Sequence, residues 1–136
     1  MDKKFLVMFI ILSMVVVPAI SGCTIKNKSD KTWGEKEPAK LSDLYIINST
    51  GDHSDRNTTF YYYIWGYIGN KAKSDASNVE ITAKYYDKNG TLLGNTTVSP
   101  YNPKIVPALS KSSFYITFED PDQKIVNYTL NIVIKK

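Results

Sequence analysis

The chain has 136 residues, with 17 Lys and Arg against 13 Asp and Glu, which gives a formal net charge of +4. This length allows one domain preceded by a leader and a tether. Because the charge excess is small and the lysines are spread along the sequence, no nucleic-acid-binding function is expected. The single cysteine excludes an intramolecular disulfide, so the fold must be stabilised by its core alone.

The N-terminus has the pattern of a secretory signal. Lys3 and Lys4 precede an apolar stretch over residues 5–17, interrupted only by Ser13, and residues 18–22 are small or helix-breaking. This order is typical of a signal peptide, because the basic residues stay cytoplasmic while the apolar segment enters the bilayer. We therefore expect residues 1–22 to be a signal peptide and the rest of the chain to be extracytoplasmic.

The segment Ser21-Gly22-Cys23 places the only cysteine directly after this leader. It resembles the lipobox of prokaryotic lipoproteins, which implies that Cys23 is acylated and anchors the protein to the cell membrane. An uncleaved membrane anchor is the alternative. The apolar stretch over residues 5–20 has 16 positions, whereas a spanning helix needs roughly 20 apolar residues. Residues 23–40 then form the lipidated cysteine and a polar tether that we expect to be flexible.

From residue 41 onward, β-branched and aromatic residues alternate with polar ones, which indicates strands. Asp87-Lys88-Asn89-Gly90 predicts a hairpin into a strand within residues 91–98, because Asn-Gly accepts positive φ. The three prolines between residues 99 and 107 mark a loop or an edge. A polar loop is expected over residues 48–59. The other predicted strands are 44–47, 60–68, 79–86, 114–118 and 128–134. Six or seven strands predict an all-β fold, an immunoglobulin-like antiparallel β-sandwich over residues 41–136.

The strand over residues 60–68 carries aromatic residues on both faces. Tyr62, Ile64, Gly66 and Ile68 share one face, and Tyr61, Tyr63, Trp65 and Tyr67 share the other. Such a strand is expected to be covered on both sides, so that the outward rings pack under the proline loop or the first strand. If they are exposed instead, Tyr61, Tyr63, Trp65 and Tyr67 form a candidate patch for a carbohydrate or a protein partner.

Three segments and a later phenylalanine carry a family resemblance: Ile64-Trp65-Gly66-Tyr67-Ile68-Gly69-Asn70, Asn78-Val79, Ala83-Lys84-Tyr85-Tyr86-Asp87-Lys88-Asn89-Gly90, and Phe114. Together they resemble the FxLYD-type module, an immunoglobulin-like domain of prokaryotic secreted and lipid-anchored proteins. The namesake motif is matched at Tyr86 and Asp87, with Ala83 and Tyr85 where Phe and Leu are expected. The resemblance implies architecture and location, and no shared catalytic residues.

Three positions have expected roles that do not depend on the resemblance. Gly66 inside a strand predicts close approach of a neighbouring chain or a bulge. Asn70 and Asp87 are expected to close strand ends by accepting hydrogen bonds from turn amides.

The only histidine, His53, lies in a polar segment with Asp52 and Asp55. These residue types bind metals, but a metal site needs three or four converging ligands. We therefore expect His53 in a solvated loop, with no metal site, no cofactor and no catalytic residue. A metal-assisted hydrolase that uses His53 is the alternative. The turns at 87–90 and 119–122 hold oxygen ligands without the spacing of a calcium loop.

Six Asn-x-Ser/Thr sequons are candidate N-glycosylation sites: Asn27, Asn48, Asn57, Asn89, Asn95 and Asn127. The expected function is that of a non-enzymatic, lipid-anchored cell-envelope protein whose domain has a binding or structural role. Its expected partners are the membrane, through the lipid anchor, and an envelope protein or carbohydrate. A passive glycosylated spacer domain is a further alternative.

Overall fold

The computed structural model describes residues 34, 36–56 and 59–136. The chain divides into two compact units, Met1–Gly34 and Glu35–Lys136, and the fold reported below is that of the second unit. Cys23, Asn27 and Asn57 lie outside the described residues, as do the leader and most of the tether. Within the described part of the chain, no helix is long and apolar enough to cross a membrane.

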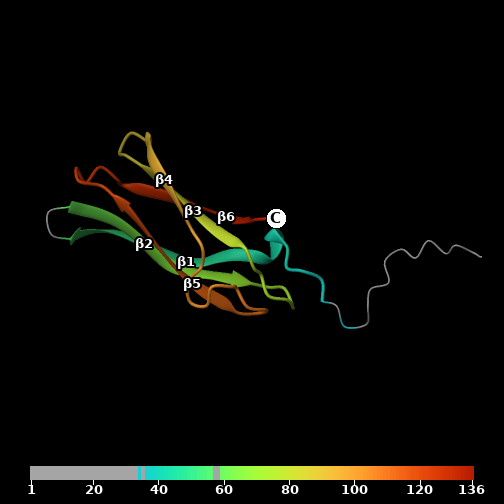
Figure 1. The fold of residues 1–136 in the computed structure, drawn as a ribbon. Helices are drawn as coiled ribbons and strands as arrows, with labels where there is room; N and C mark the ends of the chain where they lie inside the picture. The colour runs from blue at the N-terminus through green and yellow to red at the C-terminus, as the bar shows by residue number, and fades with distance from the viewer. Residues whose placement is uncertain (1–33, 35, 57–58) are drawn as a thin grey trace, which may run out of the picture. The chain divides into compact units, whose positions relative to one another are not determined.

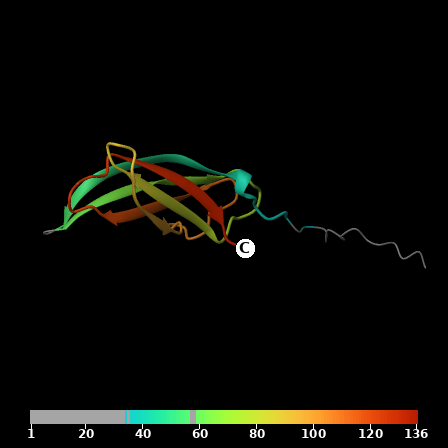
Figure 2. The same ribbon diagram turned by 90° about the horizontal axis from the view of Figure 1, so that it is seen from above.

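The second unit is a sandwich of two antiparallel three-stranded sheets, β1-β2-β5 and β4-β3-β6, which form two layers (Figures 1 and 2). This arrangement confirms the predicted fold class. The elements, in chain order, are η1 (Leu41–Asp43), β1 (Leu44–Arg56), β2 (Thr59–Asn70), β3 (Val79–Tyr86), β4 (Leu92–Val98), β5 (Lys111–Glu119) and β6 (Asn127–Ile134).

The core lies between the two sheets. Alternate residues of β2, β3 and β5 point inward because successive side chains in a strand face opposite ways. Ile64, Ile81 and Ile116 are fully buried, as is Tyr85 of β3. Each buried side chain of this size contributes roughly 1.5–3 kcal/mol relative to its exposed state. Among the described residues, the buried core residues all fall within Leu44–Ile125, so the second unit has a core of its own and is expected to fold without the preceding segment.

The loop predicted over residues 48–59 is wrong: β1 continues through this segment to Arg56 and pairs with β2 along its length. Its inward positions are polar or small, so the segment lacks the alternation of apolar and polar residues that predicts a strand. The Ser49 hydroxyl lies 2.9 Å from the Tyr128 hydroxyl, and Gly51 lies against the rings of Tyr62 and Tyr128. Large tyrosines from neighbouring strands thus fill the space that apolar residues of β1 would otherwise occupy.

The prediction that β2 is covered on both faces is also wrong. β2 is central in its sheet, but β1 and β5 flank its edges and leave its outer face open. Trp65 and Tyr67 are 41% and 40% exposed. The predicted proline loop is confirmed, but it runs along the edge of β5, where Tyr101 N–H donates to the Ser113 carbonyl (3.0 Å), and does not cover the rings.

Gly66 sits where β1 bulges between Ile46 and Asn48. A Cβ at this position would clash with the Asn48 carbonyl oxygen and would lie 2.8 Å from Cζ of Phe114, which confirms the predicted close approach. Asn70 also has its predicted role at the end of β2. It accepts a hydrogen bond from Ala72 N–H (2.8 Å), and its Nδ2 donates to the Val106 carbonyl (3.0 Å).

The predicted β3–β4 hairpin is confirmed. Asp87 Oδ1 accepts hydrogen bonds from the backbone N–H groups of Asn89 and Thr91, each at 2.8 Å. Gly90 adopts a φ of 77°, which a glycine accepts without strain. The amide of Thr91 is the main cause that lowers the pKa of Asp87, and the amide of Asn89 adds to it. The carboxylate is therefore used as a turn cap.

Candidate binding surface

The outer side of the β1-β2-β5 sheet gathers six aromatic side chains, which we call the aromatic face. Directly paired residues of antiparallel strands point to the same side of a sheet. Trp65 is paired with Tyr115, and Tyr45 with Gly69, so residues of all three strands meet on this side. The aromatic face comprises Tyr45 of β1, Tyr61, Tyr63, Trp65 and Tyr67 of β2, and Tyr115 of β5.

Three of these rings form a nearly parallel group at the centre of the sheet. The ring centroids of Tyr63 and Trp65 lie 5.2 Å apart at an interplanar angle of 22°. Those of Tyr63 and Tyr115 lie 6.3 Å apart at 26°. Trp65 is 41% and Tyr115 is 44% exposed. The rings therefore hold one another in place while much of their surface remains in contact with water.

Cations stand over the rings at one end of the aromatic face. Lys111 Nζ lies 4.3 Å from the ring centroid of Tyr67, and Lys71 Nζ lies 4.9 Å from that of Tyr45. Both distances are within the range of a cation–π interaction. At the other end, the Tyr61 hydroxyl lies 3.4 Å from Glu119 Oε1. The aromatic face thus has an apolar centre between a basic and an acidic border.

The outer side of the β4-β3-β6 sheet is polar by comparison. The hydroxyls of Thr82 and Thr97 lie 2.8 Å apart across β3 and β4. Lys84 stands between Asn95 and Thr129, its neighbours in the register. This is the surface expected of a sheet whose outer side faces only water. The fold therefore does not require aromatic residues on the outer side of a sheet, as the β1-β2-β5 sheet has them.

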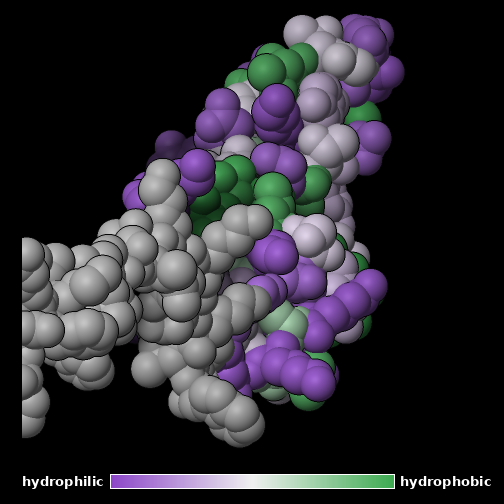
Figure 3. All heavy atoms as spheres, turned by 90° about the vertical axis from the view of Figure 1, so that its right-hand side faces the viewer, coloured by the Kyte–Doolittle hydropathy of each residue, from purple (hydrophilic) through white to green (hydrophobic). Residues whose placement is uncertain are grey.

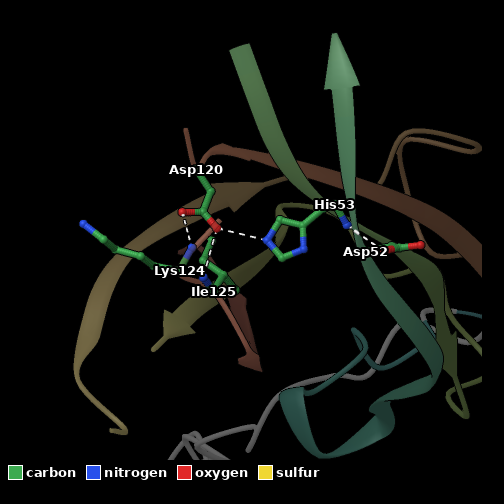
Figure 4. A network of polar contacts seen from close by, with 5 residues as sticks. All are labelled: Asp52, His53, Asp120, Lys124 and Ile125. Carbon is green, nitrogen blue, oxygen red and sulfur yellow. Dashed lines mark hydrogen bonds and ion pairs between the residues drawn. The ribbon is translucent and has the colours of Figure 1, made fainter. Parts of the chain in front are cut away.

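His53 is not in a solvated loop, as the sequence had suggested, but in β1, where it is paired with Tyr62 and points inward. Its ring contacts the Tyr62 ring edge-on at 4.9 Å. Its Nε2 lies 3.1 Å from Oδ2 of Asp120, as Figure 4 shows. The polar segment was misinterpreted because its partner, Asp120, is far away in the sequence.

Asp120 is 5% exposed and caps the β5–β6 connection. Its carboxylate accepts hydrogen bonds from the N–H groups of Lys124 (3.0 Å) and Ile125 (2.9 Å), in addition to the His53 contact (Figure 4). Burial acts to raise the pKa of Asp120, but these hydrogen bonds outweigh it and lower that pKa below its usual range. His53 and Asp120 thus join β1 to the β5–β6 connection.

Of the two candidate ligands beside His53, Asp52 does not share its side of the sheet, and the side chain of Asp55 lies outside the described part of the structure. Asp52 and His53 are consecutive in β1 and face opposite sides of the sheet, and Asp52 Oδ1 accepts a hydrogen bond from His53 N–H (2.8 Å). Within the described residues, no group of three or more His, Cys, Asp and Glu side chains is arranged to hold a metal ion.

Four candidate glycosylation sites are described, and all four are exposed: Asn48, Asn89, Asn95 and Asn127. Asn48 lies on the aromatic face, opposite Tyr67. Asn95 lies on the polar outer side of the other sheet, opposite Lys84. Asn89 belongs to the β3–β4 turn, and Asn127 begins β6. Glycans at these positions would occupy different sides of the domain.

Four of the six aromatic-face residues were predicted from the alternation along β2, whereas Tyr45 and Tyr115 were not. Tyr115 alternates with Phe114 and Ile116, so its outward direction was readable from the sequence. What was not readable was its position directly beside Trp65, because the two residues are far apart in the chain. The pairing of β2 with β5 brings them together.

A crystal structure of a DUF1425 family member from Shewanella sp. pv-4 is similar to this chain at 13% sequence identity. The TM-score is 0.39, and the match covers 66% of this chain and 74% of that chain. No protein-family model matches the sequence, and no curated protein matches it. The assignment of the fold therefore rests on the strands and their pairing, and the function has to be argued from the surface.

Proposed function

We propose that the protein is a non-enzymatic, lipid-anchored protein of the cell envelope whose FxLYD-type, immunoglobulin-like domain binds a partner on its aromatic face. The observation that carries this proposal is the exposure of Trp65 and Tyr115, which are 41% and 44% accessible at the centre of one sheet. The partner is a carbohydrate or a protein of the envelope.

Aromatic rings suit both kinds of partner. Tyr and Trp bury a large area with few rotatable bonds, so they provide binding energy at a low cost in conformational entropy. The mutual packing of Tyr63, Trp65 and Tyr115 lowers that cost further, because the rings are held in place before a partner arrives. A contiguous exposed apolar surface is typical of an interaction site.

The enzymatic alternative has less support. Nε2 of His53 is engaged by Asp120, and the imidazole packs edge-on against Tyr62. Nδ1 is left as the nitrogen that could act as a base, but within the described residues no third His, Cys, Asp or Glu side chain is grouped with this pair. The His53–Asp120 pair is better explained as a structural link between β1 and the β5–β6 connection.

Site-specific photo-cross-linking in the native host tests the binding role. A photoreactive phenylalanine analogue at position 65 or 115 should capture a specific envelope component. The same analogue at Val133 is the matched control, because Val133 is 39% exposed and lies in β6 of the opposite sheet. Equal capture from both faces, or capture from neither, would favour the passive glycosylated spacer.

The nature of the partner is tested by fluorescence. In a Trp33→Phe background, Trp65 is the only indole, because the chain has two tryptophans. Isolated envelope polysaccharide should change the Trp65 emission in a saturable manner if the partner is a carbohydrate. An unchanged spectrum, together with a captured polypeptide, would identify a protein partner instead.

The lipid anchor has its own test. Replacing Cys23 by Ala should abolish acylation and the cleavage that follows it, so the chain should keep residues 1–22 and its electrophoretic mobility should change. A chain that stays in the membrane with unchanged mobility would show that residues 5–20 act as an uncleaved anchor. Neither result depends on the aromatic face.

A further inference from the structure

One end of the domain collects most of its lysines, although these residues are spread through the sequence. At this end β1 begins, β2 and β6 end, and the 71–78 and 99–110 connections meet (Figure 1). Hydrogen bonds tie these segments together: Lys71 N–H donates to the Asp43 carbonyl (2.9 Å), and Leu109 N–H donates to the Ala72 carbonyl (3.0 Å). We call this part of the domain the basic end.

The basic end carries eight lysines and four carboxylates, all at described positions. The lysines are Lys36, Lys40, Lys71, Lys73, Lys104, Lys111, Lys135 and Lys136, and all of them are exposed. Two are paired, Lys40 with Glu37 and Lys135 with Glu80. Lys36, Lys73 and Lys104 form no ion pair with another described residue. These three extend positive charge into solvent.

The opposite end has the reverse charge balance. Its described side chains include five carboxylates against two lysines, Lys88 and Lys124. The carboxylates belong to Asp52, Asp87, Glu119, Asp120 and Asp122. The domain is therefore electrostatically polarised along its strands, which a nearly neutral sequence does not reveal. Such a charge separation orients a domain against a charged surface.

Exposed apolar residues stand among these lysines. Leu109 is 68%, Tyr101 is 60% and Ile105 is 39% exposed, all in the 99–110 connection. Tyr101 and Ile105 line a hollow together with Lys104. In Figure 3, which views the domain from this side, hydrophilic residues surround a smaller group of hydrophobic ones on the part that is not covered by grey atoms.

Hydrogen bonds of the loop fix the backbone at Leu109. Leu109 has a φ of 52°, a conformation that non-glycine residues rarely adopt. Its N–H donates to the Ala72 carbonyl, and the neighbouring Ala108 N–H donates to Asp75 Oδ1 (2.9 Å). The position of Leu109 is thus determined by hydrogen bonds to the 71–78 connection, and its side chain is left in solvent.

We propose that the basic end docks on an anionic lipid bilayer, with its lysines at the headgroups and Leu109, Tyr101 and Ile105 at the interface. Lysines near an anionic surface and aromatic or aliphatic side chains at headgroup depth are the two components of interfacial binding. The inference rests on the proposed lipid anchor for its orientation, because the chain enters the domain at this same end, through residues 36–43.

The short stretch of chain between Cys23 and the domain supports the membrane as the partner. Lys36 comes 13 positions after Cys23, and a fully extended chain over this interval spans at most about 45 Å. An anchored domain is therefore confined close to the bilayer, where even a weak surface affinity is sufficient. Docking of the basic end would place the acidic end away from the membrane and would leave the aromatic face, on the side of the sandwich, accessible to a partner.

Vesicle co-sedimentation tests the proposal without the lipid anchor. The probe is residues 24–136, which lack Cys23, mixed with vesicles of equal parts phosphatidylglycerol and phosphatidylcholine, or of phosphatidylcholine alone. We expect binding to the anionic vesicles only, and we expect it to weaken as salt is added. Sedimentation with neither vesicle, or equally with both, would overturn the proposal.

Two variants assign the binding to the basic end. Replacing Lys36, Lys73 and Lys104 by Gln should weaken anionic-vesicle binding about 100-fold, at about fivefold for each lysine near the surface. The matched control replaces Lys84, Lys88 and Lys124 by Gln, which removes the same charge elsewhere and should weaken binding far less. Leu109→Ser should weaken binding at unchanged net charge. Equal losses in the two lysine variants would contradict docking through this end.

The proposed anchor and the proposed docking fail separately. If Cys23→Ala changes the mobility of the chain while residues 24–136 bind anionic vesicles, both proposals are supported. If Cys23→Ala leaves the chain in the membrane with unchanged mobility, the lipid anchor is wrong, and vesicle binding alone decides about the basic end. If residues 24–136 do not bind vesicles, docking is wrong whatever holds the chain to the membrane.

Discussion

Nε2 of His53 and Oδ2 of Asp120 lie 3.1 Å apart and link the edge strand β1 to the β5–β6 connection. The contact is part of a larger arrangement, because the same carboxylate accepts the N–H groups of Lys124 and Ile125. A buried acceptor that serves three donors is costly to remove, since each donor would lose its partner.

Acid should destabilise the domain through Asp120. Hydrogen bonds lower the pKa of this carboxylate in the folded state despite its burial. The stabilisation it provides is therefore present above the pKa of the unfolded state, about 3.9, and is lost as the pH falls toward the lower folded value. Urea denaturation between pH 6 and pH 2 should show the free energy of unfolding falling below about pH 4.

Replacement of the Asp120 carboxylate tests its capping role at neutral pH. Asp120→Ala leaves the buried Ile125 N–H without an acceptor, so we expect a loss of about 2–3 kcal/mol near neutral pH. His53→Leu removes one donor while both backbone amides keep their acceptor, and should cost less, about 1 kcal/mol. An Asp120→Ala variant with wild-type stability would contradict the capping role.

Gly66 should tolerate substitution less well than Gly90, although only Gly90 has a positive φ. A Cβ at Gly66 meets the Asn48 carbonyl oxygen and the Phe114 ring, whereas a Cβ at Gly90 meets nothing within 4 Å. We expect Gly66→Ala to cost about 2–3 kcal/mol, because β1 or Phe114 must shift in a packed sandwich. Gly90→Ala should cost about 1 kcal/mol, through backbone strain alone. Chemical denaturation of both variants compares the two costs, and the reverse order would contradict the close approach.

The local features of the fold were predictable from the sequence, and those that depend on distant residues were not. The β3–β4 hairpin follows from Asp87 and Gly90, which lie within one turn, and the inward face of β2 follows from simple alternation. The extent of β1 could not be predicted, because its inward Ser49 and Gly51 pack against Tyr128, a residue of the last strand. For the same reason the partner of His53 was not identified.

The candidate site shows the same division. The outward direction of Tyr61, Tyr63, Trp65 and Tyr67 was expected from alternation, but their exposure was not, because no local signal tells whether another layer covers the sheet. The basic end depends even more on the fold. Its lysines come from segments that the strand order brings together, so an even spacing in the sequence becomes a concentration of charge in space.

Substitution of Trp65 on the aromatic face should abolish partner binding and leave the domain folded. Trp65→Ser removes a half-exposed ring whose packing against Tyr63 contributes about 0.5–1.5 kcal/mol beyond its buried area. Phe114→Ala, in the same sheet but on the inner side and 1% exposed, should cost about 3–5 kcal/mol. We expect Trp65→Ser to keep a cooperative thermal unfolding transition. A cross-linker at position 115 should no longer capture the partner in this variant. Retained capture in a folded Trp65→Ser variant would remove Trp65 from the site.

Removing the hydroxyl of Tyr85 should not lower, and could raise, the stability of the domain. Its side chain is fully buried, and its hydroxyl has no hydrogen-bond partner among the described residues. Burial is the main cause that raises the pKa of Tyr85; Thr96 offsets this only in part, without reaching hydrogen-bonding geometry. A buried polar group without a partner carries a desolvation cost of roughly 1–3 kcal/mol.

Tyr85→Phe keeps the ring contact with Phe118, whose centroid is 4.6 Å away, and removes that cost. We therefore expect an unchanged or higher free energy of unfolding, by up to about 1 kcal/mol, measured by urea denaturation at neutral pH. The variant should also resist alkali better. A raised folded pKa means that the stability tied to the neutral phenol is present below the unfolded pKa of about 10 and is lost above it. A clear loss of stability in Tyr85→Phe would show that the hydroxyl has a hydrogen-bond partner. A water buried between the sheets is the kind of partner that such a group typically has.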